Sequence, residues 1–302
     1  LHPCPNDREI GMLSGTPRGN VDVIPIECSA EKMSKYKVMA FLGYNKALPE
    51  DFDKLDSFVN NGGTLVIGLP HMSVTSLRKD VISLKHEYLN HDFVKKFAED
   101  FDFVSDSFNG SALEVNRCVK LDNAEVITKT DGGIPLLVKY KFGEGIVYFI
   151  NAKEYPADKA VEPVYRYVIT LLSDFLNKEE NSFIECDEHV QFAVYEQDDN
   201  SRNIYVTAVD WYKDPFEIRK AELVLNGKKY PVEMPFGLMF KIVINGNIAA
   251  WTDTESSEVL CVNENEIKVQ GFGDAMLYTV KNGSLNCCKI TFADNAVITL
   301  NI

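Results

Sequence analysis

One stretch decides the fold class of this chain: Asn61-Gly62-Gly63-Thr64-Leu65-Val66-Ile67-Gly68-Leu69-Pro70-His71. Paired glycines end a preceding helix, and the apolar run after them is typical of a buried parallel strand. A second strand launched by glycines follows at Phe142-Gly143-Glu144-Gly145-Ile146-Val147-Tyr148-Phe149-Ile150-Asn151. The two strands, one after a helix and one after a hairpin, predict an open α/β sheet with its functional groups at the strand ends.

Strands and helices alternate on the N-terminal side of this stretch. The segments 21–26 and 38–43 are β-rich and apolar, which predicts two more strands. Ser29 is placed to cap a short helix over residues 30–36. Pro49 opens a longer helix, since proline is favoured at the first helical position.

The alternation continues on the C-terminal side. We expect a helical face at 93–101, a hairpin around Asp131-Gly132-Gly133, and a closing helix over 159–177. Pro163 fits that helix only within its first turn. The order predicts a first domain over residues 1–178, an open, mostly parallel sheet with helices on both faces.

A polar segment at 178–182 marks the predicted boundary to a second domain at 183–302. Short runs of alternating polarity recur there about every ten residues, which favours an all-β antiparallel sandwich. Asn226-Gly227 is a strong hairpin-turn pattern. The runs that predict strands are 191–195, 204–209, 221–225, 230–234, 238–244, 258–262, 266–269, 275–280, 289–292 and 296–302.

Composition limits the classes of function. The 302 residues carry a net charge of −14, with a pI near 4.9, and lack the basic stripe that nucleic acids or anionic membranes require. No apolar stretch is long enough to span a membrane, and no signal peptide is recognised. The chain begins at Leu1 rather than Met, and we expect it to be part of a longer polypeptide.

The cysteines predict free thiols rather than a disulfide framework or a zinc site. Their number, seven, is odd, their spacing is irregular, and no Cys-x-x-Cys pair occurs. We expect them to be mostly buried, which favours a reducing, cytoplasmic compartment for a soluble protein. No metal site and no cofactor is predicted.

One catalytic hypothesis is a free-standing cysteine hydrolase with Cys28 as nucleophile and His71 as base, both at predicted strand ends. The alternative is that Cys28 packs in the core and His71 caps a loop. The chain has no Gly-x-Ser-x-Gly or Gly-x-Cys-x-Gly elbow to expose a nucleophile, which counts against the hydrolase.

Other candidate sites are less specific. Glu27, Glu154 and Asp158 lie near strand ends and could form a carboxylate pair, although an acidic chain places carboxylates there by chance. Trp211, with its aromatic neighbours, could stack a sugar in a carbohydrate-binding module or simply fill the core. Asn109-Gly110-Ser111 and Asn282-Gly283-Ser284 match the short glycosylation sequon.

The segments Ser14-Gly15-Thr16-Pro17, Val21 to Pro25, Tyr36-Lys37-Val38 and Gly62 to Leu65 follow one another in the order of a known module. The chain resembles the glutamine-amidotransferase-like, flavodoxin-like middle domain of large bacterial glycoside hydrolases and phosphorylases. Beta-galactosidases with a trimerisation domain and lacto-N-biose phosphorylases carry this domain. The run ending in Val209-Asp210-Trp211 resembles the start of their C-terminal β-sandwich.

The resemblance implies a non-catalytic accessory region. In those enzymes the catalytic carboxylates lie on an N-terminal barrel, for which this chain has no repeated βα pattern. The implied partners are a carbohydrate, a second copy of the chain or an N-terminal catalytic domain. Tyr44, Asn45 and His71 are the loop residues expected to bind a sugar or a neighbouring subunit.

Overall fold

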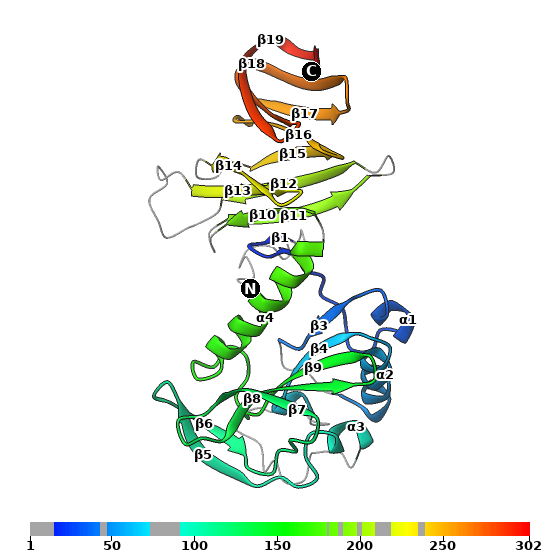
Figure 1. The fold of residues 1–302 in the computed structure, drawn as a ribbon, viewed down its shortest axis with the longest axis vertical. Helices are drawn as coiled ribbons and strands as arrows, with labels where there is room; N and C mark the ends of the chain where they lie inside the picture. Colours follow the sequence, from blue (N-terminus) through cyan, green and yellow to red (C-terminus); the bar gives the residue numbers. More distant parts are fainter. Residues whose placement is uncertain are drawn as a thin grey trace. The chain divides into compact units, whose positions relative to one another are not determined.

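The computed structural model describes residues 15–42, 47–72, 91–179, 181–186, 190–197, 201–208, 219–234 and 239–302. They divide into two compact units (Figure 1). One comprises residues 23–172, and the other comprises 15–22 together with 173–302. Residues 15–20, which the sequence assigned to the first domain, form strands β1 (Gly15–Thr16) and β2 (Gly19–Asn20) in a sheet of the second unit.

The unit 23–172 contains a mixed five-stranded sheet. Its order is β3 (Val38–Ala40), β4 (Thr64–Gly68), β9 (Gly145–Ile150), β8 (Pro135–Phe142) and β7 (Ala124–Lys129). β3, β4 and β9 run parallel, whereas β8 and β7 are antiparallel to their neighbours. The expectation of a mostly parallel sheet is corrected, because the tight turns before β8 and β9 reverse the chain without a crossover.

Both faces of this sheet are covered. α2 (Pro49–Asn60) and the one-turn helix α3 (Asp92–Lys95) pack on one face. α4 (Glu162–Glu179) and the hairpin of β5 (Phe103–Phe108) and β6 (Ser111–Asn116) contribute to the core on the other. The expected apolar stripe of α2 is buried at Phe52, Leu55, Phe58 and Val59.

Local sequence explains where the helices begin. Asp51 in the first turn of α2 accepts a hydrogen bond from the Leu48 amide at 2.9 Å, and Pro49 occupies the first helical position as predicted. Ser29 caps the short helix α1 (Ala30–Met33) by accepting from the Lys32 amide at 3.2 Å. Pro163 is the second residue of α4, where its missing N–H costs nothing.

One predicted strand of this unit is absent, and one hairpin was not predicted. The predicted strand at 21–26 does not form: none of the described strands pairs with this segment, and Val23 is 65% exposed. Strand composition alone is not enough without a neighbouring strand. The β5–β6 hairpin was not predicted, although Asn109-Gly110 turns it with φ of +50° and +73°. The same dipeptide begins the first of the two sequons.

Apart from the last residues of α4, the described secondary structure of the second unit consists of β-strands. β10 (Ser182–Cys186), β13 (Arg219–Leu225) and β14 (Lys228–Met234) form a three-stranded antiparallel sheet. Asn226-Gly227 forms the predicted turn between β13 and β14. A nine-stranded antiparallel sheet comprises β1, β2, β11 (Val190–Glu196), β12 (Arg202–Ala208), β15 (Met239–Asn245), β16 (Ile248–Thr252), β17 (Ser257–Val262), β18 (Glu266–Lys281) and β19 (Ser284–Asn301).

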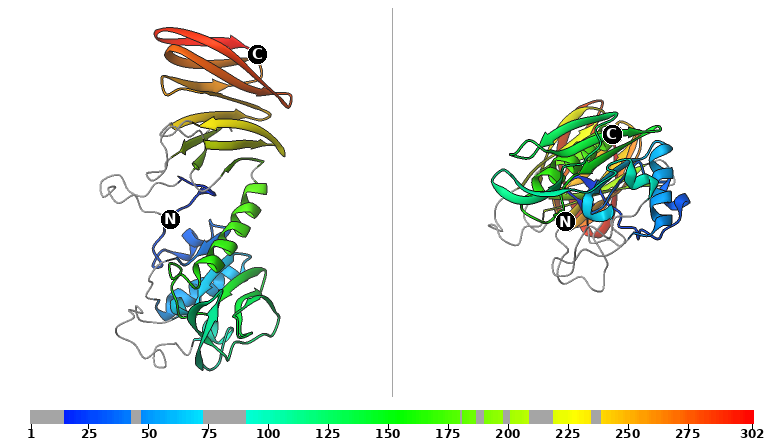
Figure 2. Two further views of the ribbon diagram at one scale, coloured as in Figure 1. Left: turned by 90° about the vertical axis from the view of Figure 1, so that its left-hand side faces the viewer. Right: turned by 90° about the horizontal axis from the view of Figure 1, so that it is seen from below.

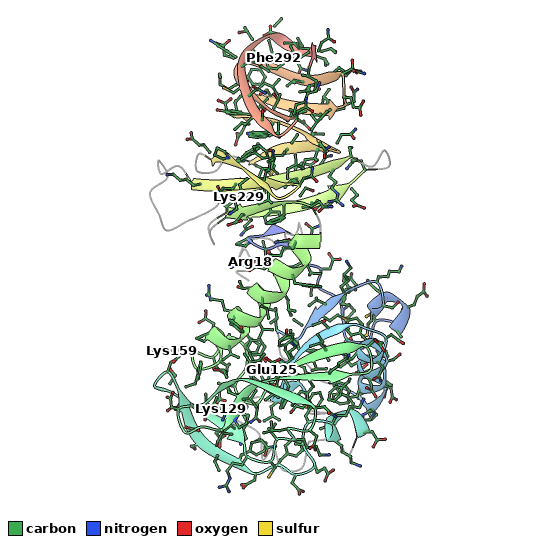
Figure 3. All side chains as sticks on the ribbon, viewed as in Figure 1. Arg18, Glu125, Lys129, Lys159, Lys229 and Phe292 are labelled. Atoms are coloured by element: carbon green, nitrogen blue, oxygen red, sulfur yellow. The ribbon has the colours of Figure 1, made fainter. Side chains whose placement is uncertain are left out.

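Two cores lie on opposite faces of β15 and β16. Ile242 and Trp251 join the core shared with β10, β13 and β14, whereas Val243 and Ala250 join a second core with β17, β18 and β19. Phe292 of β19 is labelled in Figure 3 and is buried in this second core. The predicted sandwich is therefore present, and the β17–β19 end of its larger sheet curls back over β15 and β16 to enclose the second core.

The last four predicted strands are in fact two long ones. β18 and β19 run side by side over their lengths (Figure 2), turned at Asn282-Gly283. The pairing register of β18 with β19 shifts between Gly271 and Gly273. The residues at this irregularity interrupt the alternating pattern, so the sequence predicted separate strands on either side of it. The sequon at Asn282 is likewise a hairpin turn.

The described cysteines are free thiols, as predicted, but their expected burial was wrong. Cys118, Cys287 and Cys288 are exposed, and Cys28, Cys186 and Cys261 are partly buried. Cys287 and Cys288 lie on β19, which has a sheet partner only in β18 among the described strands. None of the described helices is long and apolar enough to cross a membrane.

Candidate functional site

The carboxyl ends of β3, β4 and β9 share one edge of the mixed sheet, where the sequence placed the functional groups. β3 continues into Phe41, β4 into the 3₁₀ turn Leu69–Met72, and β9 into Asn151. Tyr44 and Asn45, predicted for the same edge, lie outside the described residues, as does Trp211.

His71 is the candidate whose surroundings are best defined. Its side chain is fully buried, and its Nδ1 accepts a hydrogen bond from the Gly68 amide at 3.1 Å. Its ring centroid lies 5.4 Å from that of Phe41 and 5.7 Å from that of Tyr155. Because Nδ1 accepts a backbone proton, a neutral ring carries its own proton on Nε2. These contacts match the loop-capping alternative and do not favour a general base.

Cys28 lies just before α1, and its side chain packs against the core formed with α2. Lys54 of α2 donates to the carbonyl oxygens of Cys28, at 3.2 Å, and of Ile26, at 2.9 Å. The Cys28 amide closes a turn onto Pro25 at 3.1 Å. None of these contacts joins Cys28 to His71, so the reactive pairing remains a prediction.

A buried hydroxyl lies beside the His71 turn. The Tyr165 hydroxyl of α4 has no hydrogen-bond partner among the described residues, and burial raises the pKa of this phenol. A Cβ added at Gly68 would overlap that hydroxyl and would approach Nδ1 of His71. Gly68 is therefore required because the α4 tyrosine crosses directly over the end of β4.

Two asparagines hold the end of β9. Asn151 is fully buried, and its Nδ2 donates to the carbonyl oxygens of Asn116, at 2.8 Å, and Pro135, at 2.9 Å. Its Oδ1 accepts from the Asn116 amide at 3.2 Å. Asn116 uses its own Oδ1 to accept from the amides of Asp102 and Cys118. Sequence reasoning missed this pair because the two residues are far apart in the chain.

The carboxylates at this edge satisfy backbone groups. Both Glu154 oxygens accept from the Glu114 amide, at 3.0 and 3.2 Å, and Asp158 accepts from the Tyr155 amide at 2.9 Å. Burial raises the pKa of Glu154. Glu27 is exposed. The proposed carboxylate pair stays a prediction, because Glu154 and Asp158 each hydrogen-bond a backbone amide and Glu27 lies on the surface.

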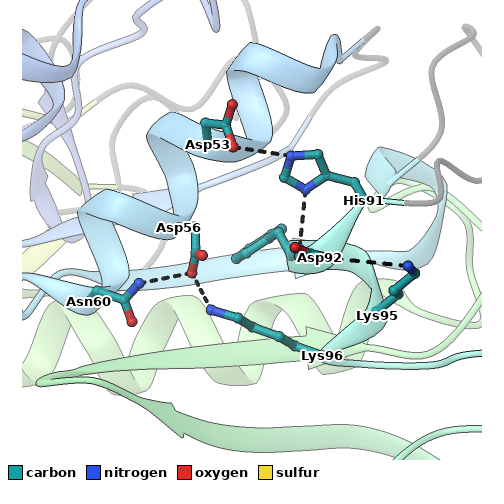
Figure 4. Close-up of polar contacts among 8 residues, drawn as sticks. Asp53, Asp56, Asn60, His91, Asp92, Lys95 and Lys96 are labelled. Atoms are coloured by element: carbon teal, nitrogen blue, oxygen red, sulfur yellow. Dashed lines mark hydrogen bonds and ion pairs between the residues drawn. The ribbon is translucent and has the colours of Figure 1, made fainter.

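A second histidine, which the sequence analysis missed, joins α2 to α3 (Figure 4). Nε2 of His91 lies 3.2 Å from the Asp53 carboxylate, and Nδ1 accepts from the Phe93 amide at 3.1 Å. Lys96 pairs with Asp56, which also accepts from Asn60 at 3.1 Å. An Asp–His pair can indicate catalysis, but here both ring nitrogens are used to cap and anchor α3.

The described part of this edge is thus packed and internally hydrogen-bonded. Within the described part of the chain, no group of three His, Cys, Asp or Glu side chains is arranged to hold a metal ion. The side chains that could carry proton transfer instead bind the backbone at His71, Glu154 and Asp158.

No family model matches the chain, and no curated protein matches its sequence. Similar solved structures include the beta-galactosidase from Rahnella sp. R3, with 15% identity and a TM-score of 0.49 over 76% of this chain and 35% of that chain. The beta-galactosidase from Bacillus circulans sp. alkalophilus has 17% identity and a TM-score of 0.48 over 76% and 36% of the two chains. A catalytic mutant of Gan42B, a GH42 beta-galactosidase from G. stearothermophilus, has 16% identity and a TM-score of 0.45 over 70% and 32%. The chain spans about a third of the length of these structures, and at these values the likeness is distant and shows no family.

Proposed function

We propose that this chain is a non-catalytic accessory region of a carbohydrate-active enzyme, a glycoside hydrolase or phosphorylase. The observation that carries the proposal is the state of the strand-end edge. His71 is buried and caps the end of β4, while the Asn151 side chain hydrogen-bonds the backbone of Asn116. An edge built in this way supports neighbouring structure, whereas a reactive site keeps a nucleophile and a base pointed at open space.

The order of the elements supports the same proposal. A mixed α/β unit is followed along the chain by an antiparallel β unit, the order expected of the amidotransferase-like module and its β-sandwich. In the proposal, the unit 23–172 is a diverged flavodoxin-like domain that has lost the strand expected at 21–26. Its roles are assembly, with a second copy or with an N-terminal catalytic domain, and the shaping of a sugar site to which Tyr44 and Asn45 contribute, while His71 supports the backbone at that edge.

The deciding experiment reads the coding sequence immediately upstream of Leu1 and then assays the chain. We expect an upstream βα-repeat barrel with paired carboxylates, and no hydrolysis of aryl glycosides or aryl esters by the chain alone. The matched variants are Cys28→Ala, which removes the candidate nucleophile, and Cys118→Ala, which removes an exposed thiol elsewhere. Ester hydrolysis that Cys28→Ala abolishes and Cys118→Ala preserves would overturn the proposal in favour of a cysteine hydrolase.

A further inference from the structure

The last strand of the nine-stranded sheet, β19, has one edge without a neighbour among the described strands. It pairs with β18 along its length, and none of the described strands pairs with its other edge (Figure 1). Cys287, Cys288, Lys289 and Thr291 of this strand are exposed. An unpaired edge presents a row of backbone N–H and C=O groups, and an extended strand is the partner that satisfies them.

The first half of β19 is a regular strand. From Ser284 to Phe292 each residue pairs in register with β18, and the irregularity of the pairing begins only beyond Phe292. This stretch, here named the 284–292 edge, contains no proline and a single charged residue, Lys289. Natural sheets block their free edges with proline, bulges or charges, so the regular half of β19 is the part able to receive a strand.

The one charge on the 284–292 edge is turned back onto the sheet. The Lys289 ammonium group pairs with the Asp274 carboxylate of β18 at 2.6 Å, and Asp274 also accepts a hydrogen bond from the Thr291 hydroxyl at 2.7 Å. Both contacts run across the β18–β19 pair, so the lysine side chain is held toward β18 and away from the free edge. Lys289 therefore does not guard this edge in the way that lysines guard sheets that must stay unpaired.

The residues of this edge favour a second copy of the same chain as the partner strand. In an antiparallel pair around a twofold axis perpendicular to the sheet, each residue opposes one an even number of positions away, because the faces are preserved. An axis at Lys289 would place two lysines opposite each other, which is unfavourable. An axis at Ile290 instead places Ile290 opposite itself and Cys288 opposite Phe292, on the face that carries the core of β17, β18 and β19. Lys289 then lies opposite Thr291.

We propose that two copies of this chain associate through the 284–292 edge, where their β19 strands pair antiparallel around a twofold axis at Ile290. The pairing continues the nine-stranded sheet of one copy into that of the other and satisfies the free backbone groups of both. Because both copies use the same edge, the association closes at a dimer. The contact is one strand wide, so we expect a reversible dimer with a Kd of about 10 to 100 µM. It needs neither a catalytic domain nor a sugar, and stands independently of the proposed function.

The test is sedimentation velocity of the whole chain from about 2 µM to about 500 µM, in a reducing buffer that keeps the exposed Cys287 and Cys288 as thiols. We expect the weight-average mass to rise with concentration from monomer toward dimer. Thr291→Lys should weaken the dimer by about tenfold or more, because each new lysine lies opposite Lys289 of the other copy. Salt at about 0.5 M should restore part of the loss, since it screens this repulsion.

Thr299→Lys is the matched control. Thr299 is exposed on the same strand but lies outside the 284–292 edge, so the dimer of this variant should stay within about threefold of the parent. Thermal unfolding checks that each variant is folded. If Thr291→Lys unfolds, Cys288→Glu replaces it, because it places a charge opposite Phe292. A parent that stays monomeric over the whole range, or equal dimerisation of the edge variant and Thr299→Lys, would overturn the proposal.

Discussion

At the residue scale, Asn151 shows how one buried amide can fix the end of a strand. It satisfies three backbone groups, on Asn116 and Pro135. Asn151→Ala leaves these groups buried without partners, and we expect the free energy of unfolding to fall by about 3 kcal/mol. Urea denaturation measures this loss. Asn60→Ala is the control, because the exposed Asn60 side chain donates to the Asp56 carboxylate and to no buried backbone group among the described contacts, so a loss of about 0.5 kcal/mol or less is expected. Equal losses in the two variants would contradict the role given to Asn151.

Glu154 gives a pH-dependent prediction at the same scale. Burial raises the pKa of its carboxyl above 4.5, so the folded protein holds the proton more tightly than the unfolded chain. The ionised carboxylate therefore costs stability above the raised pKa, and the cost disappears as pH falls toward the unfolded value. Glu154→Gln keeps an acceptor for the Glu114 amide without the charge. We expect the variant to be more stable than the parent near about pH 8 and equal to it near about pH 4, by urea titration at both values.

Asp106 is the control, because its pKa is lowered and stability should therefore change with pH in the opposite direction. Its hydrogen bond from Thr130, followed by that from the Ser107 amide, lowers the pKa of Asp106 below 3.8. Stability from this group is present above the unfolded pKa and is lost as pH falls through the folded value. Asp106→Asn should therefore be less stable than the parent at neutral pH and approach it in acid. The same pH trend in both variants would contradict the assignment.

At the element scale, two glycines in the hairpins of the mixed sheet separate backbone strain from steric overlap. Gly133 has a φ of +89° and open space around the position of a Cβ, so Gly133→Ala should cost about 1 kcal/mol. At Gly145 a Cβ would overlap the carbonyl oxygens of Val59 and Gly63, so the turn after α2 and the start of β9 would have to separate. We expect Gly145→Ala to cost about 3 kcal/mol or to prevent folding. Thermal unfolding ranks the two variants. A milder effect at Gly145 would show that the Val59 and Gly63 carbonyl oxygens leave room for a side chain there.

At the scale of the whole molecule, charge is the dominant surface property. With 45 acidic and 31 basic residues, the net charge of −14 opposes compaction through self-repulsion. Salt screens this repulsion, and we expect the Tm to rise by about 3 °C between about 0.01 M and 0.5 M NaCl. Differential scanning calorimetry measures the shift, and KCl at equal ionic strength should reproduce it. A Tm that falls with both salts would mean that favourable ion pairs outweigh the repulsion.

The sequence by itself determined the elements whose causes are local. Pro49 and the apolar spacing after it predicted α2, paired glycines predicted the start of β4, and Asn226-Gly227 predicted the β13–β14 hairpin. Each depends on residues within a few positions of one another, through backbone conformation or helical periodicity. The order of these elements also predicted one α/β unit and one all-β unit.

The tertiary structure alone decided which strands pair and which side chains meet. The 21–26 run has strand composition, but only the fold shows that none of the described strands pairs with it. Residues 15–20 join the second unit, because β1 pairs with β11 across more than half the chain. Asn151 and Asn116 become neighbours in the same way. Such contacts depend on strand register and on the packing of segments that are distant in sequence. A local sequence pattern does not encode them.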